Sequence, residues 1–284
     1  MAISAVYGLP GKGKSIFAIY YGIHLANYYE SNLVCNFILN PNKLAKYCQL
    51  MNYKWLLSNI HRVFYINSLD NAEDLFALPD SVIVFDEASI SLPARGHAST
   101  SKKLLADLCQ VRKQRQHLIY ICQSDRQVEI ALKLLAEDIF YAKGTTIFSK
   151  KLKNDKLMFK TVHRFLPENY EVWMGDPKIR RNPIKTKILC NKTWSGFLTA
   201  ADLYLFDIYN SFQRLDVSSS STASKVSGLH YVFKPGIDDF ISDENFYPHI
   251  TGHNPYKCHK LSFLSAFFLR SLKLPRLQLS LIPG

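Results

Sequence analysis

Short apolar segments alternate with longer segments of helical periodicity through the first half of the chain. The apolar segments show no polar alternation, which is typical of strands that are covered on both faces. The pattern predicts strands at residues 3–7, 32–39, 62–66, 82–85, 118–122 and 139–142. It predicts helices at residues 16–29, 42–58, 102–114 and 126–136.

This alternation predicts βαβ units, and hence an α/β fold with a mostly parallel sheet and helices on both faces. The pattern changes after Gly144. Residues 145–187 are basic and predict an insertion or hairpin at the edge of the domain, and residues 199–213 predict a helix that packs back on the core. We expect a domain at 1–215, a Ser-rich linker at 216–228 and a tail of uncertain structure at 229–284.

A glycine-rich segment joins the first predicted strand to the first predicted helix. It matches the phosphate-binding pattern G-x-x-x-x-G-K-[ST], and its residues are Gly8, Leu9, Pro10, Gly11, Lys12, Gly13, Lys14 and Ser15. Glycines let backbone N–H groups point at phosphate oxygens, and the helix amino terminus adds a positive dipole end. Lys14 is expected to reach the β- and γ-phosphates and Ser15 to bind Mg²⁺. The segment predicts binding of ATP with Mg²⁺; Lys12 faces either phosphate or solvent.

Two acidic residues, Asp86 and Glu87, directly follow the apolar run at 82–85. A buried parallel strand that ends in an acid places the carboxylate at the carboxyl edge of the sheet, where the phosphate loop also lies. We expect Asp86 to hold Mg²⁺ through water and Glu87 to act as a general base on the attacking water. The alternative is an ordinary acidic turn.

Other polar residues have positions along the chain that suit a catalytic role. Gln123 follows the predicted strand at 118–122 and is either a sensor of the γ-phosphate or a turn residue. Arg112, Arg115 and Arg126 lie nearby in sequence. An arginine that reaches a neighbouring subunit's phosphate stabilises transition-state charge. The alternatives for these arginines are a solvated helix face or a nucleic-acid contact.

Basic residues outnumber acidic ones, with 35 Lys and Arg against 23 Asp and Glu and a net charge of +12. Within residues 145–187 there are eleven basic and four acidic residues, so this stretch carries more than half of the excess. A basic surface indicates a polyanionic neighbour, such as nucleic acid, nucleotide or an anionic membrane.

The chain shows the pattern of a cytoplasmic protein. The six cysteines are scattered and read as reduced thiols, and we find no secretory signal. The best candidate for a spanning segment, 261–269, is shorter than the ~18 residues that a spanning helix needs. Residues 260–276 combine basic and apolar side chains, which fits a membrane-surface helix, a core or interface helix, or a segment without selected structure.

Taken in order along the chain, these motifs resemble those of the zonular occludens toxin (Zot) N-terminal domain family, which includes the filamentous-phage assembly protein. The resemblance covers about residues 1–215. Besides the glycine-rich loop, it rests on Val34-Cys35-Asn36, Val84-Phe85-Asp86-Glu87-Ala88, Arg112-x-x-Arg115, Ile119-Tyr120-Ile121-Cys122-Gln123 and Tyr209-Asn210-Ser211-Phe212.

The resemblance implies a P-loop ATPase of the additional-strand, catalytic-glutamate type. It also implies a role at the inner face of the host membrane in virion assembly and single-stranded DNA export, with phage or envelope proteins as partners. A motor of this kind is expected to be a homo-oligomer. Alternatives are an ATPase for DNA packaging, plasmid mobilisation or helicase-like work, and a nucleotide-gated protein without hydrolysis.

Overall fold

The computed structural model divides the chain into two units, Met1–Ser242 and Asp243–Gly284. The residues that it describes all lie in the first unit. They are residues 2–66, 69–94, 102–143, 145–148, 156–196, 205, 208–209 and 229–231.

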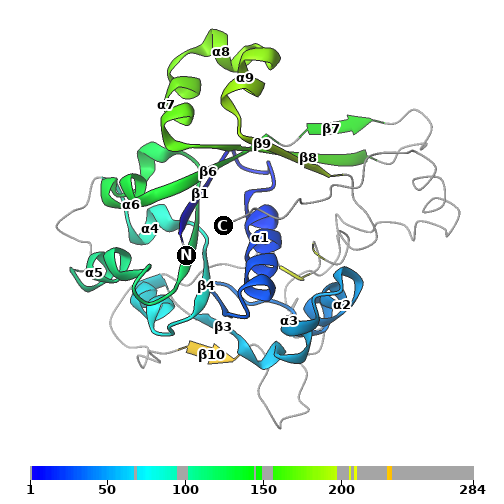
Figure 1. Ribbon diagram of the computed structural model, residues 1–284, viewed down its shortest axis with the longest axis vertical. Coiled ribbons are helices and arrows are strands. Elements are labelled where there is room, and N and C mark those ends of the chain that lie inside the picture. The colour runs from blue at the N-terminus through cyan, green and yellow to red at the C-terminus, as the bar shows by residue number, and fades with distance from the viewer. Residues whose placement is uncertain are drawn as a thin grey trace, which may run out of the picture. The chain divides into compact units, whose positions relative to one another are not determined.

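Ten strands form one sheet in this described part of the chain, in the order β10-β3-β2-β4-β5-β1-β6-β8-β7, with β9 beside β8 (Figure 1). Its parallel strands are β1 (Ile3–Tyr7), β2 (Asn32–Cys35), β3 (Val63–Ile66), β4 (Ser81–Phe85), β5 (His117–Cys122) and β6 (Ala136–Ala142). The mostly parallel sheet expected from the sequence is confirmed. The strand β5 lies between β1 and β4, the two strands that lead into the nucleotide motifs.

Helices cover both faces of this sheet, as Figure 1 shows. One face packs against α1 (Lys14–Tyr28), α2 (Pro41–Met51) and α3 (Lys54–Ser58), with η1 (Ile60–Arg62) following α3. The other packs against η2 (Leu69–Phe76), α4 (Ala88–Ser91), α5 (Lys102–Gln110) and α6 (Ile130–Leu135). In β4, Val82 and Val84 enter the first core while Ile83 and Phe85 enter the second. Both faces are buried, which explains why the central strands read as uninterrupted apolar runs.

Several predicted elements differ in extent from the observed ones. The helix expected at 102–114 ends at Gln110 as α5, and the strand expected at 32–39 ends at Cys35 as β2. The helix expected at 42–58 is divided because Asn52, at φ 58°, ends α2 in the left-handed conformation. The helix expected at 126–136 is replaced by η3 (Asp125–Gln127) and the short α6, because β6 already begins at Ala136. The start of β6 depends on its pairing with β1, which local periodicity does not show.

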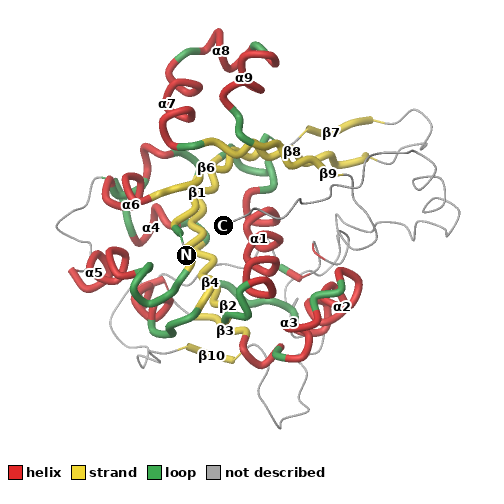
Figure 2. The backbone as a smooth tube through the Cα atoms, viewed as in Figure 1, coloured by secondary structure: helices red, strands yellow, loops and turns green. Residues whose placement is uncertain are grey.

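An antiparallel extension follows β6. The strands β7 (Thr145–Phe148) and β8 (Lys156–Phe165) pair as the expected hairpin, and β9 (Lys192–Gly196) pairs with β8. Between β8 and β9 lie three helices that the sequence did not predict, α7 (Pro167–Gly175), α8 (Pro177–Arg181) and α9 (Pro183–Leu189) (Figure 2). Each begins with proline, which suits the first turn of a helix. Tyr170 and Trp173 of α7 join the second core.

Parts of the chain beyond residue 196 also join the sheet and its core. Leu205 and Ile208 are buried in the first core, in the segment expected to pack back on it. The strand β10 (Leu229–Tyr231) pairs antiparallel with β3, so the sheet extends beyond residue 215. The predicted linker at 216–228 and the basic segment at 260–276 lie outside the described residues. Among the helices described, none has the length and apolar character needed to cross a membrane.

Candidate functional site: a phosphate loop facing a strand-end carboxylate

The glycine-rich loop runs from the carboxyl end of β1 into α1. Gly8, Gly11 and Gly13 have φ of 147°, 71° and 88°, a region that other residues rarely adopt. A Cβ at Gly8 would lie 2.6 Å from the carbonyl oxygen of Ala142 in β6. The path of the loop therefore requires glycine for its backbone angles and, at Gly8, for its close approach to β6.

Lys14, the first residue of α1, folds its side chain back onto this loop. Its side chain is 9% exposed, and its ammonium donates a hydrogen bond to the carbonyl oxygen of Leu9 at 3.2 Å. Burial lowers the pKa of Lys14, and the negative charges of Asp86 and Glu87 oppose that shift. The ammonium is thus held against the loop, within electrostatic reach of two carboxylates.

Ser15 and Asp86 meet directly at the carboxyl edge of the sheet. The Ser15 Oγ donates to the Asp86 Oδ2 at 2.8 Å, although 71 residues separate the two. Asp86 is 5% exposed, and the backbone N–H of Glu87 donates to its Oδ1 at 2.9 Å. Burial raises the pKa of Asp86, while the bonds from Ser15 and Glu87 oppose that shift. A hydroxyl and a carboxylate side by side are the hard oxygen ligands that suit Mg²⁺.

Asn36 holds the backbone of Asp86 from the neighbouring strand. Its Nδ2 donates to the Asp86 carbonyl oxygen at 2.8 Å, and its Oδ1 accepts from the Asp86 N–H at 2.8 Å. The sequence assigned no role to this residue. A signal was present: Asn36 is a polar residue directly after a buried strand, in the same position relative to β2 as Asp86 has relative to β4.

Glu87 lies beside Asp86 in a strained backbone conformation. Its φ and ψ are 52° and 42°, the left-handed region, which costs a non-glycine residue about 1–2 kcal/mol. Burial and then the charge of Asp86 raise the pKa of Glu87, and Lys14 opposes them. A half-buried carboxylate with a raised pKa, at the carboxyl edge of the sheet, has the properties of a general base.

Gln123 and Arg126 reach the same edge of the sheet. Gln123 is exposed and directly follows β5, so it lies between the ends of β1 and β4. Arg126 is exposed in η3, immediately beyond. Both positions leave the side chains available to a ligand at this edge.

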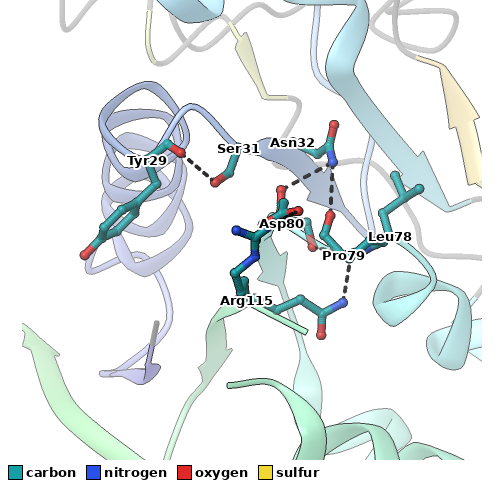
Figure 3. Close-up of polar contacts among 9 residues, drawn as sticks. Tyr29, Ser31, Asn32, Leu78, Pro79, Asp80 and Arg115 are labelled. Atoms are coloured by element: carbon teal, nitrogen blue, oxygen red, sulfur yellow. Dashed lines mark hydrogen bonds and ion pairs between the residues drawn. The ribbon is translucent and has the colours of Figure 1, made fainter. Parts of the chain in front are cut away.

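Arg112 and Arg115 lie at the opposite edge, before the start of β5. Arg115 forms two contacts of 2.7 Å with Asp80, which precedes β4 (Figure 3). Arg112 pairs at 2.6 Å with Glu137, in the first residues of β6. Within one chain, neither arginine joins Lys14 and Asp86.

Tyr209 enters the site from a distant part of the chain. Its hydroxyl donates to the Asp86 Oδ2 at 3.4 Å. Its ring packs edge-on against that of Phe37, with 4.7 Å between the ring centroids. Sequence reasoning noticed Tyr209 only as part of a resemblance and gave it no role. No local pattern reveals a contact between residues 123 positions apart.

The strand order and the loop together are those of a P-loop NTPase fold, with β5 inserted between the two motif strands. The contacts of Lys14, Ser15 and Asp86 bring the two predicted motifs together.

Among solved structures, the chain is similar to the N-terminal domain of zonular occludens toxin from Neisseria meningitidis, with 16% identity over 74% of this chain and 98% of that one and a TM-score of 0.38. It is similar to the DNA-packaging ATPase of Sulfolobus turreted icosahedral virus, with 16% identity over 57% and 91% of the two chains and a TM-score of 0.37. It is also similar to a KaiC-like protein from Pyrococcus horikoshii, with 12% identity over 57% and 77% and a TM-score of 0.36. No protein-family model and no curated protein matches the chain. At this level, the similarities concern the fold and assign no activity.

Proposed function

We propose that this chain is a Mg²⁺-dependent ATPase. The observation that carries the proposal is the 2.8 Å contact between the Ser15 hydroxyl and the Asp86 carboxylate. It joins the phosphate loop to the strand-end acid, and it places two oxygen ligands for Mg²⁺ beside a loop built to bind phosphate.

Each residue of the site has a distinct task in this proposal. Lys14 and the loop N–H groups hold the phosphates, and Ser15 and Asp86 hold the metal ion. Glu87 accepts a proton from the attacking water, and Gln123 contacts the γ-phosphate. A bound Mg²⁺ supplies positive charge that neutralises the phosphate oxygens.

An equilibrium binding experiment tests the nucleotide site before any turnover is considered. A fluorescent ATP analogue should bind the wild-type protein more tightly with Mg²⁺ than with EDTA. Lys14→Ala should lose this binding, because the ammonium is the buried positive charge facing the phosphates. Glu87→Gln should retain it, because the amide keeps the size of the side chain. Equal affinity of Lys14→Ala and wild type would contradict the proposed site.

The alternative function is a nucleotide-gated protein that binds ATP without hydrolysing it. The position of Glu87 beside Asp86 favours hydrolysis, since a binding site alone needs no general base. A Glu87→Gln variant that matches the wild type in every assay would support the alternative.

We propose that the chain uses this activity in filamentous virion assembly and single-stranded DNA export, at the inner face of the host membrane with envelope proteins as partners. The support is the ordered resemblance of its motifs to the Zot family. Packaging, plasmid mobilisation and helicase-like ATPases share these motifs. Neighbouring coat-protein genes would favour virion assembly, and a neighbouring relaxase or replication gene would favour the other roles.

The basic insertion is the proposed surface for single-stranded DNA. Within α8 and α9, its basic residues are Lys178, Arg180, Arg181, Lys185 and Lys187. Lys150, Lys151 and Lys153 belong to the same basic stretch but lie outside the described residues. Charge reversal of Arg181 and Lys185 should weaken DNA binding and reduce its dependence on salt. Unchanged affinity would remove this surface from the proposal.

The basic segment at 260–276 is proposed to lie on the membrane surface. Flotation of the full chain with anionic vesicles tests this, with Arg270 and Lys273 changed to Glu as the matched variant. Loss of flotation in the variant supports the contact, and equal flotation contradicts it.

Homo-oligomer formation would give the two arginines at the opposite edge a role in catalysis. In a head-to-tail assembly, the edge that carries Arg112 and Arg115 in one subunit would face the nucleotide site of the next subunit. Mixing Lys14→Ala subunits with Arg112→Ala, Arg115→Ala subunits tests this. Recovered activity supports a residue acting across the interface, and full activity of the double arginine variant alone contradicts it.

A further inference from the structure

Tyr209 is fixed against the loop that follows β2 by several contacts. The Asn40 N–H donates to the Ile208 carbonyl oxygen at 2.8 Å, and Tyr209 pairs with Leu39 as an antiparallel bridge. Ile208 is fully buried in the first core. The ring of Tyr209 packs against the ring of Phe37, which fixes the direction in which the Tyr209 hydroxyl points.

The Tyr209 hydroxyl points at the carboxylate of Asp86. The Oδ1 accepts from the Glu87 N–H, and the Oδ2 accepts from both Ser15 and Tyr209. These three donors together define one orientation of the buried carboxylate. If Ser15 turns its oxygen towards a cation, Glu87 and Tyr209 are the donors that continue to hold Asp86 in this orientation.

We propose that Tyr209 is a positioning residue for Asp86, so that the chain around Leu205 and Tyr209 is a functional part of the metal-nucleotide site. This inference rests on the proposed function and adds a component to it. The Tyr209–Asp86 distance of 3.4 Å is long for an O–H···O bond, so a modest effect on metal affinity is expected.

Mn²⁺ binding, followed by electron paramagnetic resonance, tests the inference without relying on turnover. The measurement uses the full chain saturated with a non-hydrolysable ATP analogue. Tyr209→Phe removes the hydroxyl and keeps the ring on Phe37. We expect Mn²⁺ affinity to fall about three- to tenfold, the effect of one lost hydrogen bond, with metal-free nucleotide affinity unchanged.

Tyr53→Phe is the matched control. It removes a hydroxyl that forms a hydrogen bond with the His24 ring at 3.3 Å. This hydroxyl is not among the three donors described above for the Asp86 carboxylate. Mn²⁺ affinity that is equal in Tyr209→Phe and wild type overturns the inference, as does an equal loss in both variants. A wild-type chain that binds no nucleotide overturns the proposed function itself, so the two failures are distinguishable.

A second measurement uses only the wild-type protein. Because metal binding and docking of this segment are coupled in both directions, Mg²⁺ should strengthen the contact between Asn40 and Ile208. Amide hydrogen exchange at Asn40 should slow when Mg²⁺ is added to the nucleotide-bound protein. Exchange that Mg²⁺ leaves unchanged contradicts the coupling.

Discussion

Asn36 and Asp86 are joined through both ends of the Asn36 amide, with two hydrogen bonds of 2.8 Å to the N–H and carbonyl oxygen of Asp86. The two residues end neighbouring parallel strands, β2 and β4. Asn36 pairs with the backbone N–H and carbonyl oxygen of Asp86, so this N–H does not compete for the Asp86 carboxylate, which accepts from Ser15. The side chain of one strand end therefore fixes the position of the proposed metal ligand on the next.

Replacing Asn36 by Ala should impair both stability and metal binding. The substitution leaves the buried N–H and carbonyl of Asp86 without partners, at about 1–3 kcal/mol for each group. Thermal unfolding and a Mg²⁺ titration of ATP binding measure the two effects.

Asn32→Ala is the control for that variant. Asn32 lies at the other end of β2 and donates to the carbonyl oxygens of Pro79 and Asp80, as Figure 3 shows. The Asn32→Ala substitution should lower the melting temperature and leave the Mg²⁺ dependence of ATP binding unchanged. Equal Mg²⁺ dependence in both variants would show that Asn36 acts on stability alone.

Gly8→Ala should disrupt the phosphate loop. The new Cβ would lie 2.6 Å from the Ala142 carbonyl oxygen, at a residue whose φ is 147°. Loop and β6 must then separate, and we expect nucleotide affinity to fall at least tenfold, or about 1.4 kcal/mol. Gly175→Ala, where a Cβ meets nothing within 4 Å, should bind nucleotide as the wild type does. Wild-type affinity of Gly8→Ala would contradict the close packing described for this loop.

The sequence was sufficient to predict the parallel core and the two nucleotide motifs. The central strands are apolar because both faces are covered, and Gly8 and Asp86 end such strands. The order of the strands depends on pairing between distant segments. Local patterns therefore do not show that β5 lies between β1 and β4. The resemblance implied an additional strand between the two motif strands, and the sheet confirms it.

Asp86→Asn should stabilise the metal-free protein at neutral pH. Burial raises the native pKa of Asp86, so the native state binds the proton more tightly than the unfolded chain does. Stability is consequently lost as the pH rises through the native pKa. Removing the buried charge should raise the melting temperature by about 2–4 °C, the shift that about 1 kcal/mol produces in a domain of this size.

Scanning calorimetry in EDTA at several pH values checks that expectation. The advantage of Asp86→Asn should shrink in acid, where Asp86 of the wild type is protonated as well. An advantage that is constant with pH, or a less stable variant at neutral pH, would contradict the assigned burial effect.

His117 should make the protein sensitive to acid with the opposite slope. Burial lowers its pKa to about 3, and its Nε2 lies 3.2 Å from the Ser4 hydroxyl. The unfolded chain binds the proton at about pH 6.5, so stability falls as the pH drops below that value. Between pH 7 and pH 5 the loss should be about 2 kcal/mol. Urea unfolding at the two pH values measures it, and His117→Gln should remove most of the difference, whereas the exposed His61→Gln should not.

Besides the role of Asn36, two further features escaped sequence reasoning, for different physical reasons. The helices α7, α8 and α9 are too short to show amphipathic periodicity, although Pro167, Pro177 and Pro183 mark their first turns. The side chains of Asp176 and Asn182 cap α8 and α9, and that cap-and-proline pattern was the available signal. Tyr209 gave no such signal, because its role depends on a long-range contact.

Steady-state ATP hydrolysis with Mg²⁺ tests the central claim most directly, comparing the wild type with Lys14→Ala and Glu87→Gln, each with and without single-stranded DNA. The account predicts turnover by the wild type that DNA increases and that both variants lose, while Glu87→Gln still binds ATP. Tight ATP binding by the wild type with no turnover under any of these conditions would contradict the claim and identify a nucleotide-gated binding protein instead.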